Sequence, residues 1–275
     1  MRLGTLLRNE VLKLGKRPAF WVIMGFFTFV TLMDLGEEFY EAMKDPSDPF
    51  ALPASWGQIF GQPMVVGAIF AAVLLVLLTA SEFPWRTARQ NVIDGLSRSE
   101  LFAGKLMLLP LLSVLFVAER VLVGGVLALV ATAGTAGGPP IGGSQWAAIG
   151  GFTLATAGYA SLALAAALAI RSSGPAMAVW FFYFAVGENL LRGGLGAAFE
   201  GLRPALSWLP LGAFGRLTSY VQYDPEAFRR AAEAAVRAER PGPLHADLGA
   251  PLLATGAWIV FFVVVSYLSF RRRDL

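Results

Sequence analysis

Six long apolar segments alternate with short charged or Gly/Pro-rich stretches along this chain of 275 residues. Most of them reach or exceed the roughly 20 apolar residues that a helix needs to cross about 30 Å of hydrocarbon. Because a bilayer offers no water to the backbone, segments of this length must be helices. We therefore predict an all-α polytopic membrane protein with six transmembrane helices in a single domain over residues 1–275. The predicted spans are Ala19–Leu35, Pro63–Ser81, Leu106–Thr132, Trp146–Ile170, Ala176–Leu191 and Leu252–Phe270.

The charges between the apolar segments favour one orientation. With the N-terminus inside, 13 of the 22 basic residues fall in short cytoplasmic stretches, among them Arg271, Arg272 and Arg273 near the C-terminus. This distribution follows the positive-inside rule and predicts that both termini are cytoplasmic. The first outer loop is acidic by contrast, with Lys44 facing Glu37, Glu38, Glu41, Asp45 and Asp48.

Composition agrees with a membrane location. The chain is 56% hydrophobic and 15% charged, with a mean hydropathy of +0.61, whereas soluble domains carry about 25% charged residues. There is no cysteine, which excludes a disulfide framework, a zinc knuckle and a thiol nucleophile. The Ala/Gly/Arg-rich composition suggests a bacterial protein from a GC-rich genome, and we expect it in the plasma (inner) membrane as a multi-pass protein, as the family resemblance described below implies.

The N-terminal residues 1–18 form a predicted amphipathic helix that lies flat at the inner interface. Its cationic side chains would meet anionic headgroups there, or they would serve only to set the topology. No A-x-A site follows the first apolar run, so we expect that run to be retained as a helix. The predicted apolar face holds Leu3, Leu6, Leu7, Val11 and Leu14, with Arg8, Lys13 and Lys16 elsewhere and Leu12 breaking the pattern.

An outer segment, residues 193–250, separates the fifth and sixth predicted spans. Its first part, Leu195–Tyr220, is apolar and aromatic, and we expect short helices there that lie at the outer interface or re-enter the membrane. Its second part has the signals of a surface helix. Asp224 is a good N-cap, Pro225 suits the first helical position, and Pro241 would end the helix.

The loop over residues 82–104, between the second and third spans, carries helix signals at both ends. Pro84 can begin a helix, and Gly95 can end it in a left-handed conformation. Ser97 and Glu100 then form a capping box that opens the third span. The sequence thus predicts a capped helix of about ten residues, parallel to the membrane.

This loop helix is either a solvated connector or a docking surface for a cytoplasmic partner. A connector needs neither two caps nor an exposed Trp, which favours docking. The predicted outward side chains include Trp85, Arg86, Arg89, Gln90 and Asp94.

The same stretch resembles ABC-2 type transporter permeases. In that family a glutamate ends the second span, a helix with a G-T-x-R/Q-like run and a G-x-S-R turn follows, and G-K opens the third span. Trp85-Arg86 departs from this pattern, since the family often has Glu-Gly there. The matching residues here are Glu82, Thr87, Arg89, Gln90, Asn91, Gly95, Ser97, Arg98, Gly104 and Lys105.

The resemblance implies partners and a role. Permeases of this family work as dimers of six-helix subunits with two separate cytoplasmic ATPase subunits, which bind ATP and Mg. The loop helix is their coupling helix and sits in a cleft of the ATPase. The resemblance thus implies a second permease subunit, and no cofactor in this chain itself. The coupling residues it implies are Glu82, Trp85, Arg86, Thr87, Arg89, Gln90, Asn91 and Asp94.

Two adjacent charges, Glu119 and Arg120, fall near the middle of the third span. A charge there costs at least about 2.5–3.5 kcal/mol, so each should face protein or water. They would line a subunit interface or a substrate route, or each would pair with another span, for instance Arg120 with Glu188. Glu188 lies near the outer end of the fifth span, where its side chain could also reach the interface, and Asp34 is within reach of that interface too.

Small residues crowd the third and fourth spans and predict close helix packing. They include Gly124, Gly125, Gly150, Gly151, Gly158 and the run Ala163–Ala169. The aromatic cluster Trp180–Phe184 predicts core or lipid contact.

Several chemistries are absent from the sequence. Gly104-Lys105 lacks the other residues of a P-loop, so any ATPase is another subunit. The single histidine, His245, cannot build an ordinary zinc site without cysteine. Basic residues line the membrane edge, so nucleic acid is not an expected partner.

We therefore expect the non-enzymatic membrane subunit of an ABC-2 type exporter. The alternative is a mechanotransmission subunit that passes ATP-driven motion to an extracytoplasmic partner through residues 193–250, without moving a solute. A third class, a stand-alone intramembrane enzyme, lacks the motifs it would need.

Overall fold

A computed structural model describes residues 3–44, 50, 52, 55–61, 64–85, 87–93, 95–132, 141–237 and 248–272. The described part is helical and contains no strand. Its long helices are α2 (Pro18–Lys44), α4 (Met64–Ala80), α6 (Arg98–Thr132), α7 (Gly143–Ile170) and α13 (Gly249–Arg271). Short helices are α1 (Leu3–Gly15), α3 (Trp56–Ile59), α5 (Thr87–Ile93), α8 (Ser173–Phe182), α9 (Glu188–Ala198), α10 (Arg203–Leu206), α11 (Pro210–Arg216) and α12 (Pro225–Arg237).

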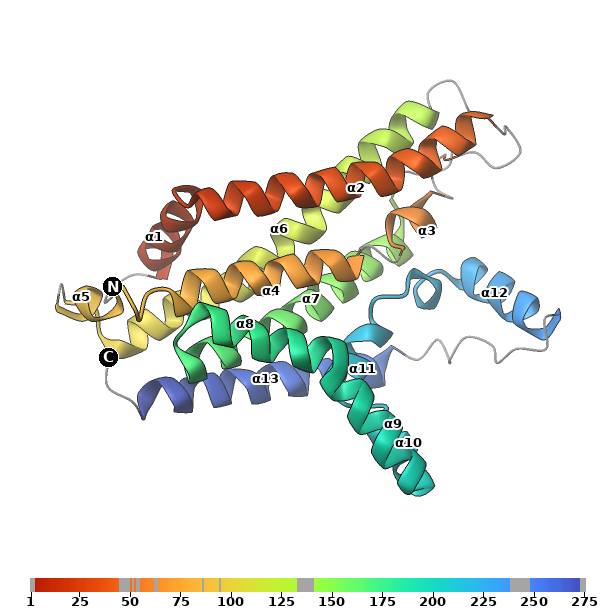
Figure 1. Cartoon of the computed structure of the whole chain (residues 1–275). Coiled ribbons are helices and arrows are strands. Elements are labelled where there is room, and N and C mark those ends of the chain that lie inside the picture. The colour runs from red at the N-terminus through yellow and green to blue at the C-terminus, as the bar shows by residue number, and fades with distance from the viewer. Residues whose placement is uncertain are drawn as a thin grey trace.

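Within the described residues, four helices, α2, α6, α7 and α13, are long and apolar enough to cross a membrane, and α4 is a shorter apolar helix. The fifth predicted span is divided into α8, a π-helical turn at Tyr183–Gly187 and α9. The long helices run side by side, with α1 and α5 at one end and α12 at the other (Figure 1). We call these the α5 end and the α12 end.

Helices α2 and α6 extend beyond their predicted spans by eight residues or more. The apolar run that ends at Leu35 continues as helix to Lys44, so Glu37, Glu38 and Glu41 lie on α2 and not in a loop. Asp45 and Asp48 lie outside the described residues. Helix α6 begins at Arg98, eight residues before the predicted span, because its capping box starts it there.

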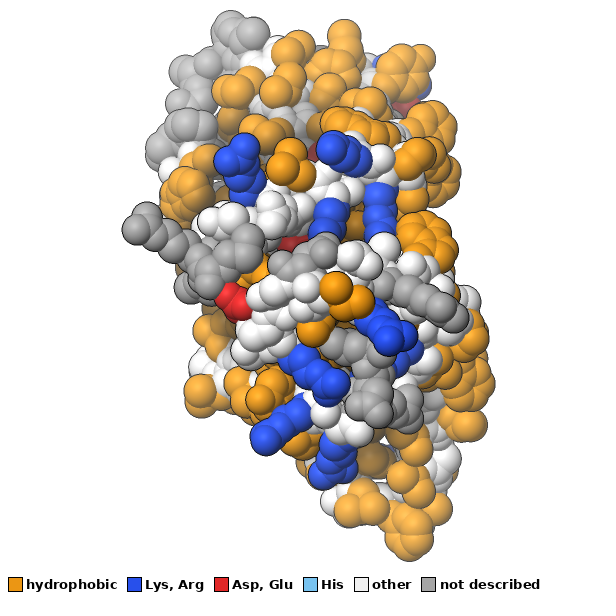
Figure 2. Space-filling view, turned by 90° about the vertical axis from the view of Figure 1, so that its left-hand side faces the viewer, with side chains coloured by type: hydrophobic (Ala, Val, Ile, Leu, Met, Phe, Trp, Pro, Cys, Tyr) orange, Lys and Arg blue, Asp and Glu red, His pale blue; other side chains and the backbone are white. Residues whose placement is uncertain are grey.

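The α5 end is basic at its surface. Figure 2 looks onto this end and shows Lys and Arg side chains spread across it, with few acidic ones and with apolar side chains on the flanks. Arg273 lies outside the described residues. The exposed basic residues of α1, α5, α6 and α13, and of the turns that directly follow α1 and α13, are Arg8, Lys16, Arg89, Arg98, Arg271 and Arg272.

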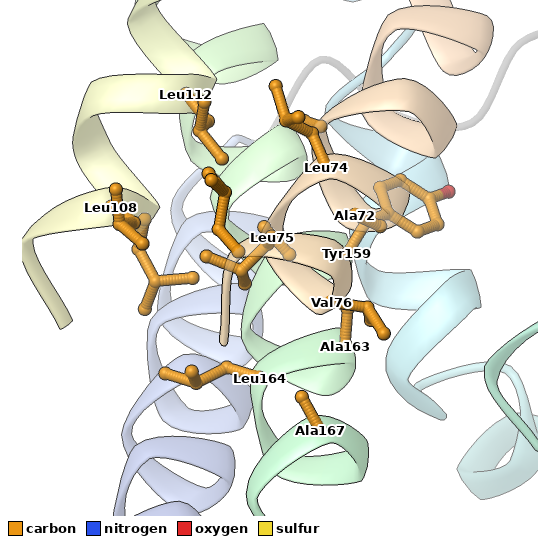
Figure 3. Close-up of a cluster of buried hydrophobic side chains, with 14 of the residues drawn as sticks. Ala72, Leu74, Leu75, Val76, Leu108, Leu112, Tyr159, Ala163, Leu164 and Ala167 are labelled. Atoms are coloured by element: carbon orange, nitrogen blue, oxygen red, sulfur yellow. The ribbon is translucent and has the colours of Figure 1, made fainter. Parts of the chain in front are cut away.

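Helix α7 is the centre of the bundle and packs against α4, α6, α8, α11 and α13. Small side chains on α7, such as Ala163 and Ala167, let α4 and α6 approach closely. Leu74, Leu75 and Leu112 fill the space between the three helices (Figure 3), and all five residues are fully buried. The core is thus a helix-helix core built from small residues against leucines.

A second apolar cluster closes the α12 end. Short helix α3 turns back into the bundle, where Trp56 and Phe60 stack at 5.5 Å and Phe60 and Phe152 stack at 5.2 Å between ring centroids. Tyr223, just before α12, joins the same cluster.

The predicted close packing at glycines is confirmed for three of five positions. A Cβ at Gly124 would lie 2.7 Å from Ile59, one at Gly158 would lie 2.6 Å from Phe214, and one at Gly151 would overlap the Tyr223 hydroxyl. Gly125 and Gly150 have nothing within 4 Å, so their predicted packing role is wrong.

The outer segment folds in part as predicted. Between α9 and α12 the chain makes only short helices, and α12 begins at Pro225 with the Glu226 amide donating to Asp224 Oδ1 at 2.9 Å. The predicted N-cap is therefore confirmed. Pro241 and His245 lie outside the described residues.

Candidate functional site

The loop helix is present and is shorter than predicted. It is α5, with seven residues from Thr87 to Ile93. Pro84 does not begin it, because Ser81–Trp85 form turns in which the Trp85 amide donates to Ser81 O at 3.4 Å. The Thr87 hydroxyl donates to Glu82 O at 3.2 Å and so joins the start of α5 to these turns.

Both predicted boundaries after α5 are confirmed. Gly95 has a φ of 101°, a left-handed conformation that suits glycine. The Ser97 amide donates to Glu100 Oε2 at 2.9 Å, and the Glu100 amide donates to Ser97 Oγ at 3.2 Å. These reciprocal bonds form the capping box that opens α6.

Several predicted coupling residues share the exposed surface of the loop. Trp85 is 67% exposed, and Thr87, Arg89 and Gln90 are exposed beside it, while Asn91 is half-buried. Arg86 and Asp94 lie outside the described residues. An exposed indole in a helical turn is a feature that protein interfaces use.

Glu82 differs from the other predicted coupling residues because its side chain is buried. Lys105 Nζ lies 2.6 Å from Glu82 Oε1 and 3.0 Å from Glu10 Oε2. Lys13 Nζ lies 2.8 Å from Glu10 Oε1 and 3.3 Å from Glu82 Oε1. We call Glu10, Lys13, Glu82 and Lys105 the ion cluster. It balances two positive against two negative charges and joins α1, the end of α4 and α6.

The ion cluster shifts the pKa values of its α1 members. Burial alone would raise the pKa of Glu10, but Lys105 and Lys13 outweigh it, and the pKa of this carboxyl lies below its ordinary value. Burial would lower the pKa of Lys13, but Glu82 and Glu10 outweigh it, and its pKa is raised. Both residues are therefore held in their charged forms.

Arg17 holds the other side of the loop. Its Nη1 donates to Ser81 Oγ at 2.8 Å and to Leu77 O at 3.0 Å. Its guanidinium also lies 5.4 Å from the centre of the Trp85 ring, within the range of a cation-π contact. Arg17, at the junction of α1 and α2, thus fixes the position of the residues that lead into α5.

A groove of about 230 Å³ runs between α1, α5 and the start of α6. Leu6 and Leu101 give it apolar walls, and Asn9 and Asn91 bring amide groups to it. The groove lies next to the exposed loop helix, so a partner that covered α5 could also reach into it.

The sequence missed part of this site because the predicted apolar face of α1 is partly wrong. The structure buries Leu6, Glu10 and Leu14, which are spaced four residues apart, and it exposes Leu7 and Val11. The signal was available, since Glu10 is the sole acidic residue among the first 33. Once such a carboxylate is buried, it needs a cationic partner, because an unpaired buried charge is costly.

Arg120 pairs within the bundle, although not with the predicted Glu188. Its side chain is fully buried, its Nη2 lies 2.6 Å from Asp34 Oδ2, and its Nε donates to Ile59 O at 2.8 Å. The sequence placed Asp34 within reach of the outer interface and assigned it no partner, so its pairing with Arg120 was not predicted. Together these contacts hold α2, α3 and α6.

Glu119 and Glu188 lie in different surroundings. The Thr31 hydroxyl donates to Glu119 Oε2 at 3.5 Å, so Glu119 faces α2. Glu188 is 1% exposed, pairs with Arg192, and accepts from the Leu211 and Gly212 amides at 2.8 and 2.9 Å. Glu188 thus fixes the start of α11 and does not reach to the interface.

A search among curated proteins finds no match to the chain. The family described as ABC-2 family transporter protein matches residues 6–187, about two thirds of the sequence. The match covers α1 to α8 and so includes the loop helix, the ion cluster and Arg120. The chain therefore belongs to the ABC-2 family of transporter permeases and is a membrane subunit of an ABC transporter.

Proposed function

We propose that this permease couples ATP hydrolysis by a separate cytoplasmic ATPase to export across a bacterial plasma membrane. The observation that carries the proposal is a short exposed helix whose base is fixed to three other elements. Pressure on α5 would reach α4 and α6 through Glu82 and Lys105, and α2 through Arg17. A loop without these contacts would bend under the same pressure.

The proposal includes six spans with both termini in the cytoplasm. Helices α2, α4, α6, α7 and α13 would be five of them, and the continuous helical stretch 173–198 would be the sixth. The basic α5 end would then face the cytoplasm, in keeping with the positive-inside rule. The acidic residues near the end of α2 would face outward.

We assign ATPase contact to Trp85, Thr87, Arg89, Gln90 and Asn91, together with Arg86 and Asp94. Glu82 would act through the ion cluster as a positioning residue, since its carboxylate is covered. The ATPase would bind ATP and Mg, and this chain would bind neither. Large exposed apolar side chains on α2, such as Trp21, Phe26 and Phe29, would be covered by lipid and by a second permease subunit.

The direct test is co-purification of the tagged chain with an ABC ATPase, identified by mass spectrometry, followed by an assay of ATP hydrolysis. Arg89→Glu should reduce both the bound ATPase and its activity, because it reverses an exposed charge on α5. Arg229→Glu, the same change on exposed α12, is the matched control. Normal assembly and activity of Arg89→Glu would overturn the docking role of α5.

Glu119 would form part of a polar patch at the subunit interface or along the substrate route. It faces α2 and Thr31 from the middle of α6, where a carboxylate is costly in lipid. Glu119→Gln should change transport or subunit assembly, measured as export or as dimer fraction. If neither changes, Glu119 is a tolerated polar residue without this role.

Helix α12 favours the second candidate function, mechanotransmission to an extracytoplasmic partner. It projects from the bundle and packs mainly against the 3-10 turn at Tyr220–Gln222 (Figure 1). Its polar face carries Glu226, Arg229, Arg230 and Glu233, and its opposite face is mostly alanine. If Arg229→Glu abolished function while ATPase binding stayed normal, the force would be delivered through this helix.

A further inference from the structure

An apolar groove lies on the flank of the bundle between α6 and α13. Its volume is about 480 Å³, and all nine residues that line it are apolar. Met107 and Pro110 of α6 form one wall, Ile259 and Val263 of α13 form the other, and Ala157 of α7 lies at the floor. The groove exists because α6 and α13 each pack on α7 more than on each other.

The α13 wall continues toward the α5 end as a row of side chains four residues apart. Residues with this spacing lie above one another on a helix. Ile259 and Val263 line the groove, Tyr267 follows and is 38% exposed, and Arg271 follows one turn later and is exposed. The row thus passes from apolar, through a phenol, to a cation.

Helix α6 meets this row at the same level. The rings of Phe102 and Tyr267 lie 5.3 Å apart, and those of Phe102 and Phe270 lie 5.9 Å apart. These aromatic contacts close the narrow end of the gap between α6 and α13. Tyr267 is thereby held at the mouth of the groove, between its apolar walls and Arg271.

We propose that this groove binds an anionic phospholipid of the inner leaflet, with an acyl chain against Met107, Ala157 and Ile259. The phosphate would lie beside Tyr267 and Arg271. Val263 is eight residues from Arg271, about 12 Å along the helix, so the chain would lie at hydrocarbon depth and the head at the interface. An aromatic and a cation at this level are the groups that membrane proteins use for headgroups.

The leaflet assignment rests on the proposed orientation, whereas the presence of a lipid site does not. The test therefore uses the purified chain alone in nanodiscs, without any ATPase. The probe is phosphatidylglycerol with a photoreactive diazirine on its acyl chain, and labelled peptides are identified by mass spectrometry. Labelling should concentrate on the α6 and α13 residues of the groove.

Ala157→Phe fills the floor of the groove. Displacing even two methylene groups, each worth about fourfold in affinity, should lower labelling of Met107 and Ile259 by about fifteenfold. Ala178→Phe makes the same change on the exposed face of α8 and should leave labelling unchanged. Equal labelling in the two variants would overturn the site.

Arg271→Gln tests the headgroup without changing the core. It should lower the preference for phosphatidylglycerol over phosphatidylcholine by about fivefold, the effect of one basic side chain at an anionic surface. Arg272→Gln, its exposed neighbour on another side of the helix, is the matched control. An unchanged preference in Arg271→Gln would overturn the proposed headgroup contact.

A second copy of the chain is the competing occupant. Since the sequence has no cysteine, Ile259→Cys introduces a single thiol into the groove. Disulfide-linked dimers from this variant in nanodiscs, with no lipid labelling of the wild type, would overturn the lipid proposal. Lipid labelling that fails would leave the ATPase co-purification test, and thus the proposed function, unaffected.

Discussion

Lys105 and Glu82 form the shortest ion pair of the cluster, with 2.6 Å between Nζ and Oε1 and with both side chains buried. Lys105 lies in the second turn of α6, and Glu82 lies two residues after the end of α4. The pair thus closes the loop that carries α5 at its base. A charge pair so fully covered is costly to break, because the partner that remains stays buried.

Lys105→Met should therefore destabilise the protein strongly. It leaves Glu10 and Glu82 facing each other with Lys13 alone, and removing one partner of a buried pair costs about 3–5 kcal/mol. Thermal unfolding in detergent measures the loss. Lys16→Met removes an exposed lysine just after the end of α1 and should be close to neutral. An unfolding midpoint that is equal in the two variants would contradict the structural role of the cluster.

The ion cluster also predicts a pH dependence. Because the folded-state pKa of Glu10 is lowered, its contribution to stability is complete above its ordinary pKa of 4.5 and is lost as the pH falls below that value. The pKa of Lys13 is raised, so its contribution is complete below 10.5 and is lost at more alkaline pH. The unfolding midpoint should thus fall at both extremes.

Glu10→Gln separates the acid limb of this profile from other titrations. The variant should have a lower midpoint near neutral pH and a flatter decline below pH 4.5 than the wild type. Glu37→Gln, at an exposed position on α2, should keep the slope of the wild type. A Glu10→Gln profile parallel to the wild-type profile would show that this carboxyl does not carry the acid dependence.

Adjacent glycines in α6 should respond oppositely to the same substitution. Gly124→Ala places a Cβ 2.7 Å from Ile59 and 3.0 Å from Leu35, both buried, and should cost about 1–3 kcal/mol by overpacking. Gly125→Ala meets nothing within 4 Å and should gain up to about 1 kcal/mol through helix propensity. The free energies of unfolding of both variants, measured in one detergent, should place Gly124→Ala below and Gly125→Ala above the wild type. Equal values would show that α3 does not pack against Gly124.

Glu188→Gln should loosen the outer segment. The carboxylate accepts from two amides at the start of α11 and pairs with Arg192, whereas an amide side chain offers one acceptor oxygen. Leaving a buried amide unpaired costs about 1–3 kcal/mol. Trypsin should cut faster at Arg216, while Glu200→Gln, an exposed change nearby, should leave the rate unchanged.

Local signals in the sequence predicted local structure well. The caps at Gly95, Ser97 and Asp224 are correct because each depends on residues within three or four positions. The family resemblance found the loop and most of its exposed residues. The predicted start of α5 at Pro84 was wrong, because Arg17 and Thr87 hold the residues before α5 in turns. The contacts of Arg17 join residues about 60 positions apart, which local sequence signals do not reveal.

Partners across the bundle were harder to predict. The sequence identified Arg120 as a buried charge, but its partner Asp34 is 86 residues away, and choosing it over Glu188 needs the packing of α2 on α6. The same holds for the ion cluster, in which Lys105 was known only as part of a motif. Burial of Glu10 depends on how α1 turns against α6, which helix periodicity alone does not fix.

The π-helical turn at Tyr183–Gly187 accommodates one residue more than an α-helix would hold. Each residue of an α-helix rotates the chain by about 100° about the helix axis, so this surplus residue determines which way the side chains of α9 point. Deleting a single residue here would turn Glu188 away from α11 by roughly a quarter of a circle while leaving an equally hydrophobic helix. A length change that hydropathy cannot detect would therefore remove the carboxylate contact at the start of α11, although α11 and α13 would still have α7 to pack against.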